Sequence, residues 1–280
     1  MKLYRQMVDD LTQVYPEGEA RALVRRTFED GFGLSQTEVL LGKDSELSAD
    51  DIANAREIVA RLLHHEPIQY ILGFTDFCGH RFRVAPGALI PRPETQQLVH
   101  LVLDSLPAGC RGGILDIGTG SGCIALSLAL ALPDAHVTAW DISDEALSVA
   151  RSNAALHPRA RVTFEQADIL APPADDRRWQ VIVSNPPYVL QSEARQMEPN
   201  VLDYEPHRAL FVPDDDPLRF YRAIGRYAQS HLAPGGMLFL EINQALGAET
   251  AHLIEEYGLL DVRVERDSFG LDRFVIALQP

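Results

Sequence analysis

The sequence is poor in the features that mark secreted, membrane-bound and metal-binding proteins. Its 280 residues include three cysteines, Cys78, Cys110 and Cys123, which are far apart and in no Cys-x-x-Cys spacing. Neither disulfides nor a zinc site is therefore expected. No apolar run approaches the roughly 18 residues of a transmembrane helix, and the N-terminus lacks the apolar core of a signal peptide. We expect a protein of the reducing cytoplasm that holds no metal and contacts no membrane.

Positive charge is also scarce. The chain has 40 acidic and 25 basic residues, a net charge of −15, and its only lysines are Lys2 and Lys43. Tight, non-specific binding to nucleic acid needs clustered Lys and Arg, so no direct nucleic-acid binding is expected. A hydrophobic content of 46% with 23% charged residues indicates a soluble globular protein of one large or two ordinary domains.

Apolar periodicity divides the chain into a helical first part and a mixed second part. Three stretches have apolar side chains at helical spacing: residues 3–14, 20–28 and 52–63. They predict a small helical bundle over residues 1–73. Residues 74–84 have strand-like composition around a Cys-Gly-His turn and predict a β-hairpin. We expect residues 74–90 to link the bundle to a second domain of residues 91–280.

Strands and helices alternate from residue 112 onward. The seven expected strands are 113–117, 136–140, 161–165, 180–184, 236–241, 260–265 and 273–278. The expected helices are 94–106, 122–132, 144–156, 217–231 and 244–257. This alternation predicts an α/β fold with a mainly parallel, doubly wound sheet, to which the last two strands add an antiparallel pair.

A glycine-rich turn, Gly118-Thr119-Gly120-Ser121-Gly122, follows the first of these strands. Glycine permits positive φ and close approach of the backbone to a ligand. The dinucleotide fingerprint G-x-G-x-x-G needs a third glycine where Cys123 stands. The pattern resembles instead the loop that binds S-adenosylmethionine (SAM). Asp116 at the strand end suits SAM, which carries an ammonium and a sulfonium and no pyrophosphate.

Acidic residues also follow the next two strands. Asp141 lies where a carboxylate can accept hydrogen bonds from both ribose hydroxyls, although a helix N-cap is an alternative role. Asp168 and Ile169 follow the third strand. In methyltransferases with such a loop, these two positions contact the adenine, the first by hydrogen bonding and the second by packing. We expect all three residues to bind the cofactor.

Asn185-Pro186-Pro187-Tyr188 directly follows the strand 180–184. Two prolines cannot continue a sheet ladder, and a residue before proline is extended. The motif is therefore held rigidly at the carboxyl edge of the sheet, where open α/β sheets bind ligands. It resembles the signature of class I methyltransferases that act on a planar amino or amide nitrogen. That resemblance implies catalytic roles for Asn185, Pro186 and Tyr188, acceptor binding by all four residues, and an Asn185 that borders the cofactor.

Further motifs surround these sites in order: Pro67-Ile68-Gln69-Tyr70-Ile71-Leu72-Gly73, Leu89-Ile90-Pro91-Arg92-Pro93-Glu94-Thr95 and Tyr204-Glu205-Pro206. With them the chain resembles, over nearly its whole length, the peptide chain release factor glutamine N5-methyltransferases, the PrmC/HemK family. The resemblance implies a Rossmann-like, seven-stranded class I methyltransferase domain after a helical domain that recognises the substrate. It also implies methyl transfer from SAM to the side-chain amide nitrogen of the Gly-Gly-Gln glutamine in bacterial release factors.

The resemblance leaves two questions of detail. Arg92 and Glu94 either close over the site from the linker side or form a structural ion pair beside a proline-rich turn. Glu241-Ile242-Asn243-Gln244 departs from many relatives, which have Glu-x-Gly there.

Other functions share parts of the pattern. A ribosomal-protein glutamine methyltransferase would use the same acceptor chemistry, although the Pro-Arg-Pro-Glu segment weighs against it. A DNA or RNA adenine N6-methyltransferase has a similar motif, but the charge of −15 disfavours it. Cys123 disfavours an oxidoreductase, and the intact Asn-Pro-Pro-Tyr motif disfavours a SAM-binding module without activity.

Overall fold

A computed structural model describes residues 2–107 and 109–280, which form two compact units. The first unit comprises the described residues up to Phe74 together with the segment Glu198–Tyr204. The second comprises Thr75–Met197 and Glu205–Pro280. The sequence pattern did not indicate that a segment from the second half of the chain groups with the helical part.

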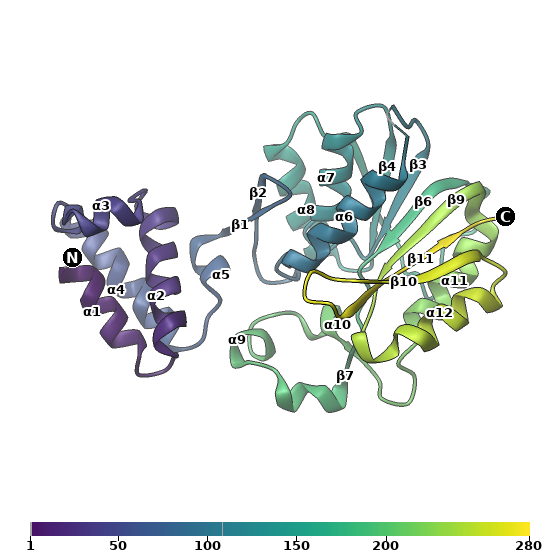
Figure 1. Cartoon of the computed structure of the whole chain (residues 1–280). Helices are drawn as coiled ribbons and strands as arrows, with labels where there is room; N and C mark the ends of the chain where they lie inside the picture. Colours follow the sequence, from purple (N-terminus) through teal and green to yellow (C-terminus); the bar gives the residue numbers. More distant parts are fainter. Residues whose placement is uncertain (1, 108) are drawn as a thin grey trace. The chain divides into compact units, whose positions relative to one another are not determined.

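The first unit is helical (Figure 1). Its helices are α1 (Lys2–Leu11), α2 (Glu17–Arg26), α3 (Gln36–Leu40), α4 (Ala49–Leu63), α5 (Ile68–Leu72) and α9 (Pro199–Leu202). The core forms where apolar faces meet, and Leu11, Val24 and Phe28 are at most 1% exposed there. Ser48 begins α4 with a capping box, because its hydroxyl accepts from Asp51 N while the Asp51 carboxylate accepts from Ser48 N.

The second unit is built on a seven-stranded sheet of order β10-β11-β9-β6-β3-β4-β5. Its strands are β3 (Gly113–Ile117), β4 (His136–Asp141), β5 (Val162–Gln166), β6 (Trp179–Ser184), β9 (Leu232–Glu241), β10 (Leu260–Arg266) and β11 (Asp272–Leu278). Neighbours from β5 to β9 are parallel, and β11 is antiparallel to both β9 and β10. The predicted α/β fold, with its antiparallel pair at the end, is confirmed.

Helices cover both faces of this sheet. They are α6 (Pro93–Ser105), α7 (Cys123–Ala131), α8 (Asp144–Leu156), α11 (Arg219–His231) and α12 (Gly247–Glu256). Side chains of α6 and α7 share one apolar core with the sheet, and those of α11 and α12 share the other. The strand β6 is buried on both faces, because Val181, Ile182 and Val183 are all fully buried. A central parallel strand has this continuous apolar composition.

The hairpin of β1 (Phe74–Phe77) and β2 (His80–Arg83) forms as expected. Phe77 and Phe82 are at most 1% exposed and belong to the same apolar core as α6 and α7. Their rings meet edge to face at a centroid distance of 6.0 Å. The hairpin is therefore packed into the second unit, and is more than a flexible connection.

The segment between Tyr188 and α11 contains short elements that apolar periodicity did not indicate. A two-stranded sheet joins β7 (Val189–Leu190) to β8 (Phe211–Val212), and α10 (His207–Leu210) precedes β8. Within residues 2–107 and 109–280, no helix is both long and apolar enough to cross a membrane. The same residues contain no cluster of three or more His, Cys, Asp or Glu side chains that could hold a metal ion.

Candidate active site

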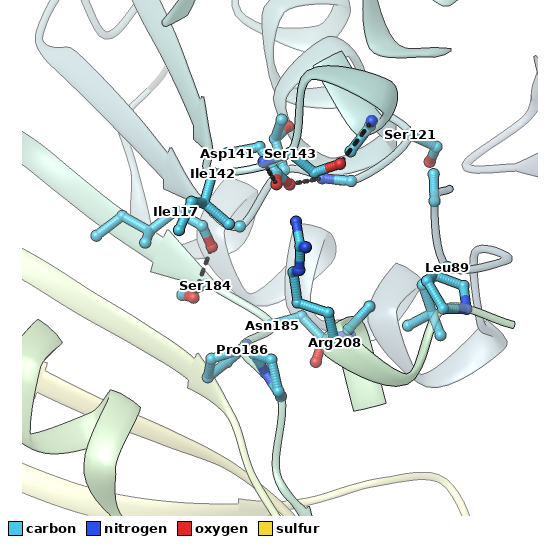
Figure 2. A pocket seen from close by; sticks show the side chains of 18 of the residues that line it. Leu89, Ile117, Ser121, Asp141, Ile142, Ser143, Ser184, Asn185, Pro186 and Arg208 are labelled. Carbon is cyan, nitrogen blue, oxygen red and sulfur yellow. Dashed lines mark hydrogen bonds between the residues drawn. The ribbon is translucent and has the colours of Figure 1, made fainter. Parts of the chain in front are cut away.

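A cavity of about 590 Å³ lies in the second unit, at the carboxyl ends of the parallel strands (Figure 2). This volume is typical of a small-molecule site. Its lining comes from the glycine-rich turn after β3, the ends of β4, β5 and β6, the segment before α6, and the segment around α10. The sequence motifs converge here because parallel strands present their carboxyl ends at one edge of the sheet.

The glycine-rich turn needs its glycines for two reasons. Gly118, Gly120 and Gly122 all have positive φ, at 75°, 54° and 80°. A Cβ on Gly122 would lie 3.1 Å from the Ala150 side chain, so this glycine also lets α7 approach α8. Four residues of the turn, Gly118, Thr119, Gly120 and Ser121, line the cavity, whereas Gly122 does not.

Asp116 supports the turn from within the protein. It is fully buried and is not a lining residue. One carboxylate oxygen accepts hydrogen bonds from Thr119 Oγ1 at 2.6 Å and from Ala125 N at 3.2 Å. Burial raises the pKa of Asp116 to about 7. The geometry thus favours an indirect role, in which Asp116 fixes the loop that faces the cavity.

Asp141 faces the cavity and is held from both sides. Its two oxygens accept from Gly120 N and from Ser143 N, each at 2.9 Å (Figure 2). Ser143, not Asp141, is the N-cap of α8, because its hydroxyl accepts from Ala146 N. The N-cap alternative for Asp141 is therefore wrong, and each carboxylate oxygen retains a lone pair for a ligand.

The surroundings of Asp141 raise its pKa above the ordinary value of 3.8. Burial raises the pKa of Asp141, while the backbone hydrogen bonds and Arg208 oppose that shift. Figure 2 shows the Arg208 side chain extending from the α10 segment toward Asp141. Arg208 lies outside every sequence motif and was not predicted as a site residue. Asp168 and Ile169 line the cavity as well, and Asp168 accepts from Leu170 N at 2.8 Å.

The Asn-Pro-Pro-Tyr turn divides between the cavity and the protein interior. Asn185, Pro186 and Pro187 line the cavity. Tyr188 is not a lining residue; its ring packs against the apolar core of α11 and α12, and its hydroxyl donates to Glu241 at 3.1 Å. Burial raises the pKa of Tyr188. The ring therefore contacts the core side of the turn, and the catalytic and acceptor-binding roles of Tyr188 stay predictions.

Arg92 and Glu94 do not form the expected pair at the cavity. Arg92 lines the cavity and forms an ion pair with Glu205, which is only 4% exposed and also accepts from Ile90 N at 3.0 Å. Glu94 does not line the cavity. The Pro-Arg-Pro-Glu and Tyr-Glu-Pro motifs thus meet through Arg92 and Glu205, a pairing that sequence analysis missed because 113 residues separate them.

Three further residues near Asn185 were missed as parts of the site. Thr95 is 3% exposed, accepts from Asn185 Nδ2 at 3.1 Å and donates to Glu241 at 2.8 Å. Burial raises the pKa of Glu241 to about 7. Asn243 donates to the Tyr188 carbonyl at 3.1 Å and so stabilises the turn. The available signal was that Glu241 ends β9, which is parallel to β6, just as Asp141 ends β4.

A cofactor with a ribose and positive charge fits this lining better than a dinucleotide. Asp141 and Asp168 offer carboxylate oxygens to hydroxyl and amino groups, whereas a pyrophosphate beside them would be repelled. SAM carries an ammonium, a sulfonium and ribose hydroxyls, and no phosphate. With the sheet order and the Asn-Pro-Pro-Tyr turn, these features make the second unit a class I SAM-dependent methyltransferase domain.

Comparison with known proteins narrows this class. Residues 95–202 match the family model "Methyltransferase small domain", and residues 2–73 match "PrmC N-terminal domain". The release factor glutamine methyltransferase of Bacteroides thetaiotaomicron is 50% identical over 95% of both chains. That of Flavobacterium psychrophilum is 41% identical over 98% of both. The chain belongs to the release factor glutamine methyltransferase family.

Solved structures agree on the fold. The 16S rRNA N2 G1207 methyltransferase of Thermus thermophilus, solved with AdoMet and guanosine, is 19% identical, with a TM-score of 0.55. The match covers 74% of this chain and 50% of that one. At this identity the likeness supports the methyltransferase fold alone.

Proposed function

We propose that this protein transfers a methyl group from SAM to the side-chain amide nitrogen (N5) of the glutamine in the Gly-Gly-Gln motif of bacterial peptide chain release factors. The observation that carries the proposal is the Asn185 carboxamide, whose nitrogen is bonded inside the protein while the residue lines the cavity. The names of the relatives supply the particular substrate. Release factors act in the cytoplasm, and three dispersed cysteines suit that reducing compartment.

The cofactor would be held by residues of the cavity lining. Asp141 accepts from the ribose hydroxyls, Asp168 from the adenine amino group, and Ile169 packs on the adenine ring. The turn from Gly118 to Ser121 brings backbone close to the amino-acid portion, while Gly122 and Asp116 maintain its shape. When bound, SAM supplies an electrophilic methyl group on a sulfonium.

The acceptor would be activated by position. An amide nitrogen is a poor nucleophile because its lone pair is delocalised. If Asn185 Oδ1 and the Pro186 carbonyl each accept one N–H, the lone pair of the nitrogen is directed at the methyl carbon. These oxygens also stabilise the positive charge that develops on nitrogen. Such positioning contributes roughly 7–11 kcal/mol where the geometry is near attack. A strong general base is not needed, because the proton can leave after methyl transfer.

The helical unit has a separate role in this proposal. Residues 1–73 would bind the body of the release factor, while a flexible glycine-flanked loop carries the glutamine into the cavity. Binding energy from surface remote from the reacting nitrogen would then contribute to kcat/KM. The match of residues 2–73 to a domain model of the same family supports this division of labour.

Mass spectrometry of a purified release factor incubated with the protein and SAM tests the proposal. We expect one added methyl group, located by peptide fragmentation on the Gly-Gly-Gln glutamine. Ribosomal protein and duplex DNA are incubated in parallel. Methylation of either of these, with none on the release factor, would replace the proposal by one of the sibling activities.

A further inference from the structure

A buried chain of hydrogen bonds lies directly behind Asn185. Asn185 Nδ2 donates to Thr95 Oγ1 at 3.1 Å, and Thr95 Oγ1 donates to Glu241 Oε2 at 2.8 Å. The three residues come from the turn after β6, the first turn of α6 and the end of β9. Thr95 and Glu241 are only 3% and 1% exposed. These hydrogen bonds therefore connect a residue that lines the cavity to an ionisable group in the interior.

The direction of these hydrogen bonds is fixed by the carboxylate. An ionised carboxylate can only accept, and Glu241 accepts on both oxygens, from Thr95 and from Tyr188 Oη at 3.1 Å. The single hydroxyl hydrogen of Thr95 is thus committed to Glu241. Thr95 then offers only lone pairs to Asn185, so the NH₂ end of that carboxamide must face it. The oxygen end is left for the cavity.

We propose that Thr95 and Glu241 are positioning residues of the acceptor site, which hold the Asn185 carboxamide with its oxygen toward the acceptor nitrogen. This inference rests on the proposed function and deepens it. An Asn side chain in a turn can rotate its amide by half a turn at little steric cost, since oxygen and nitrogen are similar in size. Only the orientation set by Thr95 and Glu241 presents an acceptor to an N–H group, so the pair selects a neutral amide or amine as substrate.

Protonation of Glu241 would reverse the donor and acceptor roles in these hydrogen bonds. A proton on Oε2 would donate to Thr95, whose own hydrogen would turn toward Asn185. The carboxamide would then rotate to present its oxygen to Thr95 and its NH₂ group to the cavity. Two donors would face each other across the acceptor site, and methyl transfer would lose a positioned partner.

The surroundings of Glu241 put this change in an accessible pH range. Burial raises its pKa to about 7, and Glu94 from α6 adds to that shift. Hydrogen bonds from Thr95 and Tyr188, and the charge of Arg273 on β11, oppose it. Tyr221 on α11 donates to the Glu241 carbonyl at 3.3 Å. The ionised, active form of Glu241 therefore predominates above about pH 7 and is lost below it.

The first experiment compares three threonine variants by single-turnover methylation of a Gly-Gly-Gln peptide. Thr95→Val keeps the side-chain shape and removes the hydroxyl, so we expect the rate to fall by about tenfold or more. SAM affinity should stay within a few-fold. Thr95→Ser restores a hydroxyl and should recover most of the rate. Thr250→Val is the matched control, because Thr250 is fully buried in α12 and its hydroxyl makes no hydrogen bond to any described residue.

The second experiment measures the methylation rate as a function of pH. If Glu241 only stabilised the fold, its replacement would not change the shape of this pH profile. The rate of the parent protein should rise between about pH 6 and pH 8 as Glu241 ionises. Glu241→Gln cannot ionise and should lose this rise, at a rate below that of the parent above pH 7. The two experiments use variants of different residues, so either one still tests the inference if the variant in the other fails to fold.

Two results would overturn the inference: a parental rate in folded Thr95→Val, or an unchanged pH profile in folded Glu241→Gln. Failure of the proposed function looks different. In that case the parent protein itself does not methylate the glutamine, of peptide or of release factor, at any pH.

Discussion

Asn153 on α8 binds the main chain of Arg83 in both directions. Its Oδ1 accepts from Arg83 N at 2.6 Å, and its Nδ2 donates to Arg83 O at 3.0 Å. The same Nδ2 donates to Ser121 O at 2.9 Å, within the glycine-rich turn. One fully buried side chain thus joins the end of the hairpin to the glycine-rich turn.

This relationship predicts a large effect of Asn153→Ala on stability. The substitution removes three hydrogen bonds, of which the one to Ser121 O is buried and the two to the Arg83 main chain are part-buried. At about 0.5–1.5 kcal/mol each, their loss should lower the unfolding free energy by at least about 1.5 kcal/mol. Urea denaturation measures it. Arg151→Ala on the exposed side of the same helix is the control and should change stability little. A loss in Asn153→Ala no greater than in this control would show that the hairpin is held by its apolar contacts alone.

Asp141→Ala should weaken SAM binding. The proposed hydrogen bonds to the ribose are charge-assisted, so their loss costs about 1.5–3 kcal/mol, or roughly ten- to a hundredfold in Kd. Isothermal titration measures the change. Asp141→Asn keeps one accepting oxygen and should lose less SAM affinity than Asp141→Ala. Equal SAM affinity in folded Asp141→Ala and the parent would remove Asp141 from the cofactor site.

Asn185→Ala should separate binding from chemistry. The substitution removes the acceptor-facing oxygen, so the single-turnover rate should fall by at least about 10²-fold, the usual result of losing one positioned electrostatic partner. SAM affinity should remain within a few-fold of the parent, as Asp141 and the glycine-rich turn are untouched. A near-parental rate would mean that Asn185 only shapes the turn.

Strand positions could be predicted from the sequence because buried β-branched runs end in Gly, Asp or Pro. The Val181-Ile182-Val183 run is one example, and β6 ends within a residue of the prediction. Residues at strand ends were then assigned to one edge of the sheet, which brought Asp141, Asp168 and Asn185 together. Two-residue strands such as β7 and β8 have no periodicity to detect. The strand β9 also begins earlier than predicted, at Leu232, with an irregular register against β6.

Contacts between distant side chains were not predictable in the same way. Thr95 and Glu241 lie 146 residues apart, and neither residue type indicates a partner without the topology. For Arg92, the motif suggested a charged neighbour in sequence, Glu94. The structure supplies Glu205 instead, which lies 113 residues further along the chain. Side-chain pairing of this kind depends on tertiary placement, which periodicity does not encode.

Stability should depend on pH through Asp116. Burial raises its folded pKa from 3.8 to about 7. A raised carboxyl pKa means that the folded state binds the proton more tightly, so this contribution to stability is present at about pH 4 and is lost as pH rises to about 7. Asp116→Asn does not titrate. The stability of this variant relative to the parent should therefore increase by up to about 4 kcal/mol over that range.

Chemical denaturation of both proteins at several pH values measures this difference. The other ionisable groups are common to the two proteins, so their contributions cancel. A difference that stays constant with pH would show that Asp116 is ionised at no cost in the folded protein, through a partner that its second oxygen acquires in solution.

Removal of residues 1–74 should affect the two substrates unequally. If the helical unit binds the body of the release factor, the shortened chain loses the binding energy that lies far from the reacting nitrogen. We expect kcat/KM toward intact release factor to fall by about 10²-fold or more, and kcat/KM toward a Gly-Gly-Gln peptide to fall only several-fold. SAM binding by titration checks that the second unit is folded, which matters because Glu198–Tyr204 groups with the helical unit. Equal losses on both substrates, with SAM binding intact, would mean that the helical unit supports catalysis in the second unit and does not dock the substrate.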